Sequence, residues 1–304
     1  MNRSLFSTCR SALLVVVAAL LGQAMALAQT VTTYPDYNVD PAVTEWNATP
    51  GIAAGDTVIL ENNSTSTASG NATVNNGTLQ FNNSAAFNSP YEFGLAMSGT
   101  GVVQAISGTT SLTGTNSYTG GTTIDSGAAL IVTTSSLPGA VTNDGVLRFQ
   151  QDTNGTFAGA ITGTGGIIQR YGAGTVTLTG TNSQAFEIYN DPFGGRLVGN
   201  TDSLKGTIQN NGGTLEFNQT SNGTFIGSFG TFDTGFVYKT GPGDLTLTGN
   251  NRLQAGGQSD LFVQAGRVVG AGESLDFNGT IDISNGAELR IDEPVGGFTT
   301  PGIK

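Results

Sequence analysis

The sequence predicts an all-β protein whose short strands wind into a parallel β-helix, a solenoid of roughly 12 coils. Three observations lead to this fold class. Charged residues make up only 11% of the 304 residues, while glycine, with 46 residues, is about twice as frequent as in an average protein. Apolar and polar residues alternate over short stretches, and these stretches recur along the chain. Disordered chains are usually rich in charge and proline, so this composition indicates strands joined by glycine and asparagine turns.

The N-terminal segment differs from the rest of the chain and predicts a cleaved signal peptide. Arg3 and Arg10 lie near its start without an acidic residue, and an apolar run, ALLVVVAALLG, follows them. The run has the length of a secretory signal core and falls short of the about 20 residues that span a bilayer. Ala26 and Ala28 supply the small residues that signal peptidase needs, so the mature chain is expected to begin at Gln29. The alternative, a buried N-terminal helix, has no helical partner in the sequence that follows.

Cleavage at this position would also remove the only cysteine, Cys9, and two positive charges. The net charge would change from −11 to −13, because residues 1–28 contain two arginines and no acid. A chain this acidic is unsuited to nucleic acid, whose phosphates would repel it. Without thiols the mature chain needs neither disulfide bonds nor a reducing compartment, as expected for an exported protein.

A repeated unit of about 68 residues is the strongest evidence for a solenoid. Four related stretches, NNGTLQF, NDGVLRF, NNGGTLEF and SNGAELRI, carry leucines at nearly regular intervals: Leu79, Leu147, Leu215 and Leu289. The leucines of three LTG lines recur at almost the same interval: Leu112, Leu178 and Leu247. We therefore expect an N-terminal cap and first coil over 29–70. A β-helix of these units is expected over 71–304, with the last repeat incomplete.

Alternation within each unit predicts half-buried strands. In GTVTLTG, Val176 and Leu178 would face the core and Thr177 the solvent. In GTLEFN, Leu215 and Phe217 would point inward. The residue between the two apolar positions varies between units, as a solvated face allows: Gln80, Arg148, Glu216 and Arg290.

Two architectures could use such units. A string of immunoglobulin-like sandwiches would need about 100 residues per domain and, in true immunoglobulin domains, a core tryptophan with a cysteine pair. Here the unit is shorter, and the only tryptophan, Trp46, precedes the first repeat. A parallel β-helix, in which like residues of stacked coils form ladders, fits better, because one unit would make about three coils of roughly 22 residues. Trp46 and the stretch YPDYNVDP at 34–41 are expected to cap the first coil.

The sequence offers no residue that can be assigned to catalysis, to a cofactor or to a metal. The absence of histidine excludes Ser-His-Asp, Cys-His and histidine-based zinc sites. The stretch IDSGA resembles a serine-protease nucleophile context, but no histidine can activate Ser126, so Asp125 and Ser126 are expected to be turn residues. The stretch GPGDLTLTG at 241–249 resembles a calcium-binding nonapeptide once, where that motif must repeat in tandem.

Carboxylates leave a carbohydrate-active β-helix enzyme, a polysaccharide lyase or hydrolase, as the alternative function. A glycosidase needs two carboxyl groups about 5 to 9.5 Å apart. Several acids could meet in this way across adjacent coils: Asp233, Asp244, Asp282, Asp292 and Glu293. The chain has 22 acidic residues, so some pairs would lie close together by chance, and no enzyme activity is expected.

Residues 98–130, SGTGVVQAISGTTSLTGTNSYTGGTTIDSGAAL, resemble the autotransporter-associated β-strand repeat of bacterial passenger domains, also called the passenger-associated transport repeat. That repeat typically reads as a Gly-Thr strand, LTLTG, NTYTGGT and a short strand that ends in a glycine turn. Two later stretches, GAGTVTLTGTNSQAF and GPGDLTLTGNNRLQAGG, keep the first half of the pattern and depart in the second. The resemblance covers most of 60–290 and implies a right-handed parallel β-helix.

The resemblance also implies export to the surface of a Gram-negative cell through a C-terminal outer-membrane barrel. No barrel-like alternation follows residue 290, so we expect that this translocator is missing from the chain as written. The expected function is an exported passenger, secreted or at the outer cell surface, that acts as a structural stalk or adhesin and contributes to virulence. Its expected partners are molecules on host or neighbouring cells, or a second copy of itself, with no cofactor.

Overall fold

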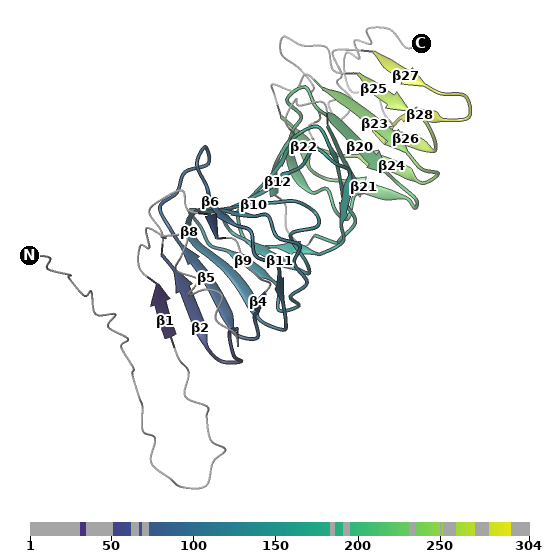
Figure 1. Cartoon of the computed structure of the whole chain (residues 1–304). Helices are drawn as coiled ribbons and strands as arrows, with labels where there is room; N and C mark the ends of the chain where they lie inside the picture. The colour runs from purple at the N-terminus through teal and green to yellow at the C-terminus, as the bar shows by residue number, and fades with distance from the viewer. Residues whose placement is uncertain are drawn as a thin grey trace, which may run out of the picture.

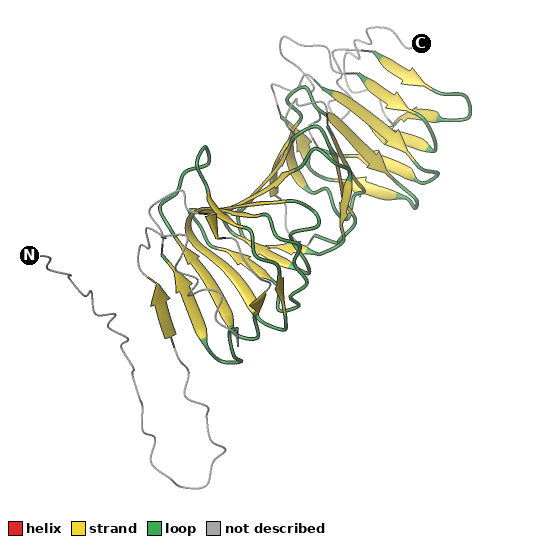
Figure 2. Cartoon of the chain, viewed as in Figure 1, coloured by secondary structure: helices red, strands yellow, loops and turns green. Residues whose placement is uncertain are grey.

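The computed structural model describes residues 31–34, 51–61, 67–68, 73–182, 186–190, 195–230, 235–249, 251, 260–270 and 280–292. All regular elements in these ranges are β-strands, and none is a helix (Figures 1 and 2). The strands pair in parallel with strands one turn away along the chain. The predicted all-β parallel solenoid is therefore confirmed.

The strands are short, as the sequence predicts. In chain order they are β1 (Val31–Tyr34), β2 (Thr57–Leu60), β3 (Thr67–Ala68), β4 (Thr73–Val74), β5 (Thr78–Asn82), β6 (Tyr91–Phe93), β7 (Met97–Ser98), β8 (Val102–Leu112), β9 (Thr122–Ile124), β10 (Ala128–Val132), β11 (Val141–Asn143), β12 (Val146–Gln150), β13 (Gly155–Phe157), β14 (Ile161–Thr162), β15 (Ile167–Tyr171), β16 (Thr175–Leu178), β17 (Phe186–Asn190), β18 (Arg196–Gly199), β19 (Gly206–Gln209), β20 (Thr214–Asn218), β21 (Gly223–Phe225), β22 (Ser228–Phe229), β23 (Phe236–Thr240), β24 (Asp244–Leu247), β25 (Leu261–Val263), β26 (Arg267–Gly270), β27 (Ile281–Ile283) and β28 (Glu288–Ile291).

The fullest turns of the solenoid consist of three strands on three faces, while others, such as the turn from β15 to β17, have two described strands. In the middle of the chain β12, β13 and β14 follow one another, and β15 and β16 then stack in parallel on β12 and β13. Leu147 pairs with Ile168, and Ile168 pairs in turn with Ile188. The separation of these paired residues along the chain is close to the predicted coil length of about 22 residues.

The number of turns is smaller than predicted. The longest sheet joins β1, β2, β5, β8, β10, β12, β15, β17, β19 and β22 in that order, and the solenoid has about nine turns. The prediction of roughly 12 coils divides the length of the whole mature chain by a uniform coil length. The strands of the described residues cover less of the chain than that division assumes.

The repeated unit does not coincide with a whole number of turns. From Leu147 the chain passes Ile168, Ile188 and Ile208 on the same face, and then reaches Leu215 on the next face. The other two units behave in the same way. The earlier one passes Val103, Thr122 and Val141 on one face before it reaches Leu147 on the next. The later one passes Val237, Leu261 and Ile281 before it reaches Leu289. Each unit therefore advances three turns and one face.

Equivalent residues of successive units consequently belong to different faces of the rod. The expected ladders of like residues therefore do not join equivalent residues of the units. The ladders that exist combine different positions of the unit, as in the row of Leu147, Ile168, Ile188 and Ile208. Because only the inward apolar character is shared along a row, the outward side chains are free to differ from turn to turn.

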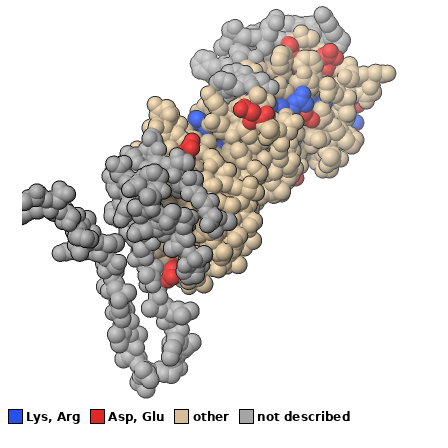
Figure 3. Space-filling model, viewed as in Figure 1, with Lys and Arg blue, Asp and Glu red and all other residues tan. Residues whose placement is uncertain are grey.

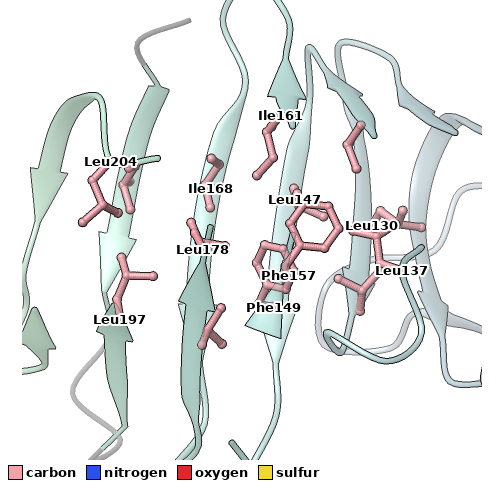
Figure 4. Close-up of a cluster of buried hydrophobic side chains, with 14 of the residues drawn as sticks. Leu130, Leu137, Leu147, Phe149, Phe157, Ile161, Ile168, Leu178, Leu197 and Leu204 are labelled. Atoms are coloured by element: carbon pink, nitrogen blue, oxygen red, sulfur yellow. The ribbon is translucent and has the colours of Figure 1, made fainter. Parts of the chain in front are cut away.

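The core is a continuous column of apolar side chains inside the three faces. Leu178 and Phe217, which the alternation places inward, are 2% and 0% exposed. Figure 4 shows side chains from successive strands, such as Leu147, Phe157 and Ile168, lying together in the interior. Phe149 and Phe157, from β12 and β13, have ring centroids 5.4 Å apart. The predicted register of the inward residues is confirmed.

The asparagine of the LTGTN line bonds to the turns on both sides of its own. Asn116 Oδ1 accepts a hydrogen bond from Met97 N (2.9 Å), and Asn116 Nδ2 donates to Ser136 O (2.6 Å). In the next such line Asn182 makes the same two bonds, at 2.9 and 2.5 Å. Both asparagines are buried. Buried backbone groups need partners, so the repeated polar line has a structural role at this corner.

A second set of buried asparagines links each turn to the next. Each comes shortly before a repeated leucine and donates from Nδ2 to a backbone carbonyl of the following turn: Asn75 to Val102 (2.9 Å), Asn143 to Ile167 (3.0 Å) and Asn210 to Phe236 (3.3 Å). The bond recurs in three units on three faces. Asparagine therefore serves the stacking of turns in addition to the turn conformations predicted for it.

We expect the Asn116→Ala substitution to lower the free energy of unfolding by about 2 kcal/mol, because it leaves two buried backbone groups without their partner. Thr115→Ala is the matched control, since Thr115 is exposed, and it should change stability by less than about 0.5 kcal/mol. Urea denaturation followed by circular dichroism measures both changes. Equal losses for the two variants would show that the Asn116 bonds contribute nothing to stability.

Candidate functional site

The stretch that resembles a serine-protease context forms a turn, as predicted. Asp125 and Ser126 lie between β9 and β10, and Ala128 N donates to Asp125 O (3.0 Å). Gly127 has a φ of +88°, a conformation that favours glycine. The segment therefore turns the chain from one face of the solenoid to the next.

Two of the carboxylates considered for an enzyme, Asp244 and Asp292, lie beside arginines. Arg267 Nε is 3.1 Å from Glu288 Oε2 and 3.8 Å from Asp244 Oδ1, and Arg290 Nε is 2.6 Å from Asp292 Oδ1. Asp282 is exposed on β27. The remaining candidates, Asp233 and Glu293, lie outside the described residues. Over the described ranges no three or more acidic, histidine or cysteine side chains gather where they could hold a metal ion.

The features predicted for the N-terminus fall on residues that the structure does not describe: Cys9, Ala26, Ala28, Gln29 and Trp46. Their predictions therefore stay predictions. Within the described part of the chain, no helix could cross a membrane.

Most of the described surface on the face shown in Figure 3 carries no charge, and the charged side chains are scattered.

The outward position Glu216 differs from its prediction, because it is 9% exposed and not solvated. Arg196 Nη1 lies 2.5 Å from one carboxylate oxygen of Glu216, and Thr240 Oγ1 donates to the other (2.6 Å). Arg196 also lies over Tyr238, whose ring stacks on Phe262 at 4.7 Å. Arg148, which stands one unit earlier at the position equivalent to Glu216, lies over two aromatic rings.

Two inward positions carry buried cations. Arg170 on β15 and Lys239 on β23 occupy the same place in successive units, and both are 0% exposed. Lys239 Nζ donates to the carbonyl oxygens of Thr240 (2.8 Å), Gly241 (2.8 Å) and Ala265 (2.9 Å). Burial lowers the pKa of Lys239 from 10.5, and the charge of Asp244 opposes this shift. The alternation of Lys239 with Val237 in the sequence indicates that Lys239 points inward, but a basic residue was not expected in the interior.

Arg170 uses different partners at the equivalent place. Its Nε donates to Asn190 Oδ1 (2.6 Å), and its Nη1 donates to Gly172 O (2.5 Å). Asn190 Nδ2 donates in turn to Asn210 Oδ1 (2.6 Å). These contacts consist of neutral acceptors in the interior, so both cations bind parts of the fold and neither faces an open site.

A surface concavity lies at a corner that two units build in the same way. In one unit Gln151 Oε1 accepts from Thr134 N (2.8 Å), and Gln151 Nε2 donates to Thr153 O (2.8 Å). One unit later Gln219 repeats the arrangement with Thr201 N (2.9 Å) and Ser221 O (3.4 Å). Comparison of VTTSSL with VGNTDSL would have revealed this repeat in the sequence.

A groove lies at this corner in both of these units. The later groove, called the 200–226 groove here, has a volume of about 310 Å³, and its lining includes Thr201, Asp202, Lys205, Asn222 and Ile226. The earlier groove, of about 530 Å³, is more open and is lined by residues that include Gln151, Thr153 and Tyr171. No residue of either groove was proposed as a site from the sequence.

The sequence profile of the passenger-associated-transport-repeat family matches residues 107–131, 171–185 and 237–268. Each matched segment contains or adjoins an LTG line, on β8, β16 and β24. No curated protein and no solved structure matches the chain. The matched segments agree with the repeats recognised in the sequence and with the parallel solenoid into which they fold. In these three segments the chain therefore matches passenger-associated transport repeats, the repeats of autotransporter passengers.

Proposed function

We infer that this protein is an exported passenger of a Gram-negative bacterium, which acts as a structural stalk or adhesin in the secreted state or at the outer cell surface. The observation that carries the proposal is the coincidence of the three matched repeats with stacked strands of one parallel solenoid. A separate translocator barrel would be its export partner. Molecules on host or neighbouring cells, or a second copy of the chain, would be its contacts at the surface.

The architecture supports a projecting role. Each turn of a parallel solenoid adds about 4.8 Å along the axis, so repeated turns lengthen the rod at a low cost in sequence information. Because each unit advances one face, loops of equivalent sequence are presented on all three faces in succession. A rod of this kind can display corner loops in several directions without changing its core.

The proposed domain organisation follows from the same reasoning. Residues 1–28 would be removed as a signal peptide, with Ala26 and Ala28 as the small residues of the cleavage site. Residues 29–70 would form the N-terminal cap and first coil, and residues 71–304 would form the β-helix. A carbohydrate-active enzyme was the alternative. Nothing in the described residues favours it, since Asp244 and Asp292 lie beside arginines.

Expression of the full chain in a Gram-negative host tests the proposal. The exported form should begin at Gln29 and contain no thiol, which its intact mass would show. Purified exported protein should bind host or neighbouring cells if it is an adhesin, and should bind none if it is only a stalk. Retention of Cys9 in the final product would contradict the proposed export route.

A further inference from the structure

The 200–226 groove differs from the equivalent corner of the preceding unit in several side chains, and three of these differences add a charge or apolar surface. Others are milder or remove a charge, as Thr220 does in place of Asp152. The backbone and the glutamine of this corner are repeated from the preceding unit, but at three positions a small or neutral residue is replaced by a charged or larger one. Asp202 stands where that unit has Ser135, Lys205 where it has Pro138, and Ile226 where it has Ala158. All three new side chains line the same groove. A structural corner needs none of them, because the preceding unit folds in the same way without them.

Ile226 is the most exposed large apolar side chain of the described residues. It is 75% exposed and stands beside hydroxyl and amide groups. A single exposed apolar residue is common on protein surfaces. Here it accompanies a charge of each sign in one concavity, and ligand sites combine an apolar surface with a few placed polar groups in this way.

Two polar groups of the groove, those of Asn222 and Lys205, are held in place by the fold. Asn222 Oδ1 accepts from Asp244 N (2.9 Å), which fixes the amide and leaves its Nδ2 as a donor. Lys205 Nζ donates to Asn182 O (2.6 Å) and keeps two further N–H groups. Within the described residues, the Asp202 carboxylate makes no hydrogen bond or ion pair and is exposed. The preorganised amide of Asn222 and ammonium of Lys205 lower the entropic cost of binding a ligand.

The chemistry of the groove selects among ligand classes. An anionic ligand would be repelled by Asp202 and by the net negative charge of the protein, and a cationic ligand would be repelled by Lys205. A peptide that adds a strand needs free backbone groups. Here Thr201 N and Leu204 N already donate, to Gln219 Oε1 and Asn200 O. A neutral polyhydroxylated ligand fits, since each hydroxyl both donates and accepts, and an aliphatic side chain can cover its C–H surface.

We propose that the 200–226 groove binds a neutral oligosaccharide through Asp202, Lys205, Asn222 and Ile226. This deepens the proposed adhesin role and rests on it, because it names the class of surface molecule that the rod would contact. Asp202 would accept hydrogen bonds from adjacent sugar hydroxyls, while Lys205 and Asn222 would donate to ring or hydroxyl oxygens. Ile226 would lie against the less polar face of a sugar ring.

The test uses the purified exported chain and a printed panel of neutral, sialylated and sulfated oligosaccharides, followed by calorimetric titration of the best neutral one. Asp202→Ser should weaken binding about tenfold, as loss of a charge-assisted hydrogen bond does. Ile226→Ala should weaken it about threefold through lost apolar contact. Both variants install the residue of the preceding unit, so their melting temperatures should equal that of the unmodified protein. Ser135→Ala, at the equivalent corner, is the matched control and should leave binding unchanged.

Three results would overturn the proposal: no neutral glycan on the panel is bound, only sialylated or sulfated glycans are bound, or Asp202→Ser binds as tightly as the unmodified protein. Binding to whole cells separates this proposal from the adhesin role. If Asp202→Ser still binds cells fully, the adhesin role stands and the groove assignment fails. If the chain binds the neutral glycan but no cells, the groove assignment stands and the adhesin role fails.

Discussion

Replacement of Leu178 by aspartate should lower the free energy of unfolding by about 4 kcal/mol or more, because it buries an unpaired carboxylate in an apolar interior. Leu178 ends β16 and is 2% exposed. On the same face its strand stacks on β13, where Phe157 is its register partner. The phenylalanine ring offers no hydrogen-bond donor to the new charge. Thermal and urea unfolding of the purified chain measure the loss.

Thr177→Asp is the matched control, one position away and pointing outward. Thr177 is half-buried, and its register partners are Thr156 and Val198. The new carboxylate would reach solvent, so the cost should stay below about 1 kcal/mol. Similar losses for the two variants would show that the inward and outward residues of β16 have been assigned to the wrong sides.

The inward register could be read from the sequence because it depends on a local property. In GTVTLTG and GTLEFN the alternation of apolar and polar residues has the period of a strand, so Leu178 and Phe217 could be placed inside without knowing their neighbours. The length of a turn followed only approximately from the length of the repeated unit. The extra face per unit could not be derived, because it depends on a small difference between the expected and the actual length of a turn.

Features that depend on contacts between turns escaped prediction for the same reason. Asp202 and Ile226 share a groove because one turn separates them, and the sequence does not give the corner geometry that brings them together. Glu216 was expected in solvent because its own strand places it outward. Its burial comes from Arg196 and Thr240, which belong to the neighbouring strands β18 and β23. Pairwise contacts of this kind require the register between turns.

Replacement of Lys239 by methionine should lower the free energy of unfolding by about 2 to 4 kcal/mol. Methionine would keep most of the apolar stem between Phe217 and Val263, the register partners of Lys239 on either side. It would remove the ammonium that donates to three backbone carbonyl oxygens, among them those of Gly241 and Ala265. Carbonyls that lose a charged donor in the interior are costly to leave without it. Urea denaturation at neutral pH measures the change.

Arg290→Met controls for the loss of one positive charge, because the Arg290 side chain is 53% exposed, and it should cost less than about 1 kcal/mol. A second measurement uses the pH dependence. Burial lowers the native pKa of Lys239 below 10.5, so the unfolded chain binds more protons between the native pKa and 10.5. The stability of the unmodified protein relative to Lys239→Met should therefore rise with pH through that window. A relative stability that falls there would mean that the carbonyl oxygens hold the ammonium more strongly than burial disfavours it.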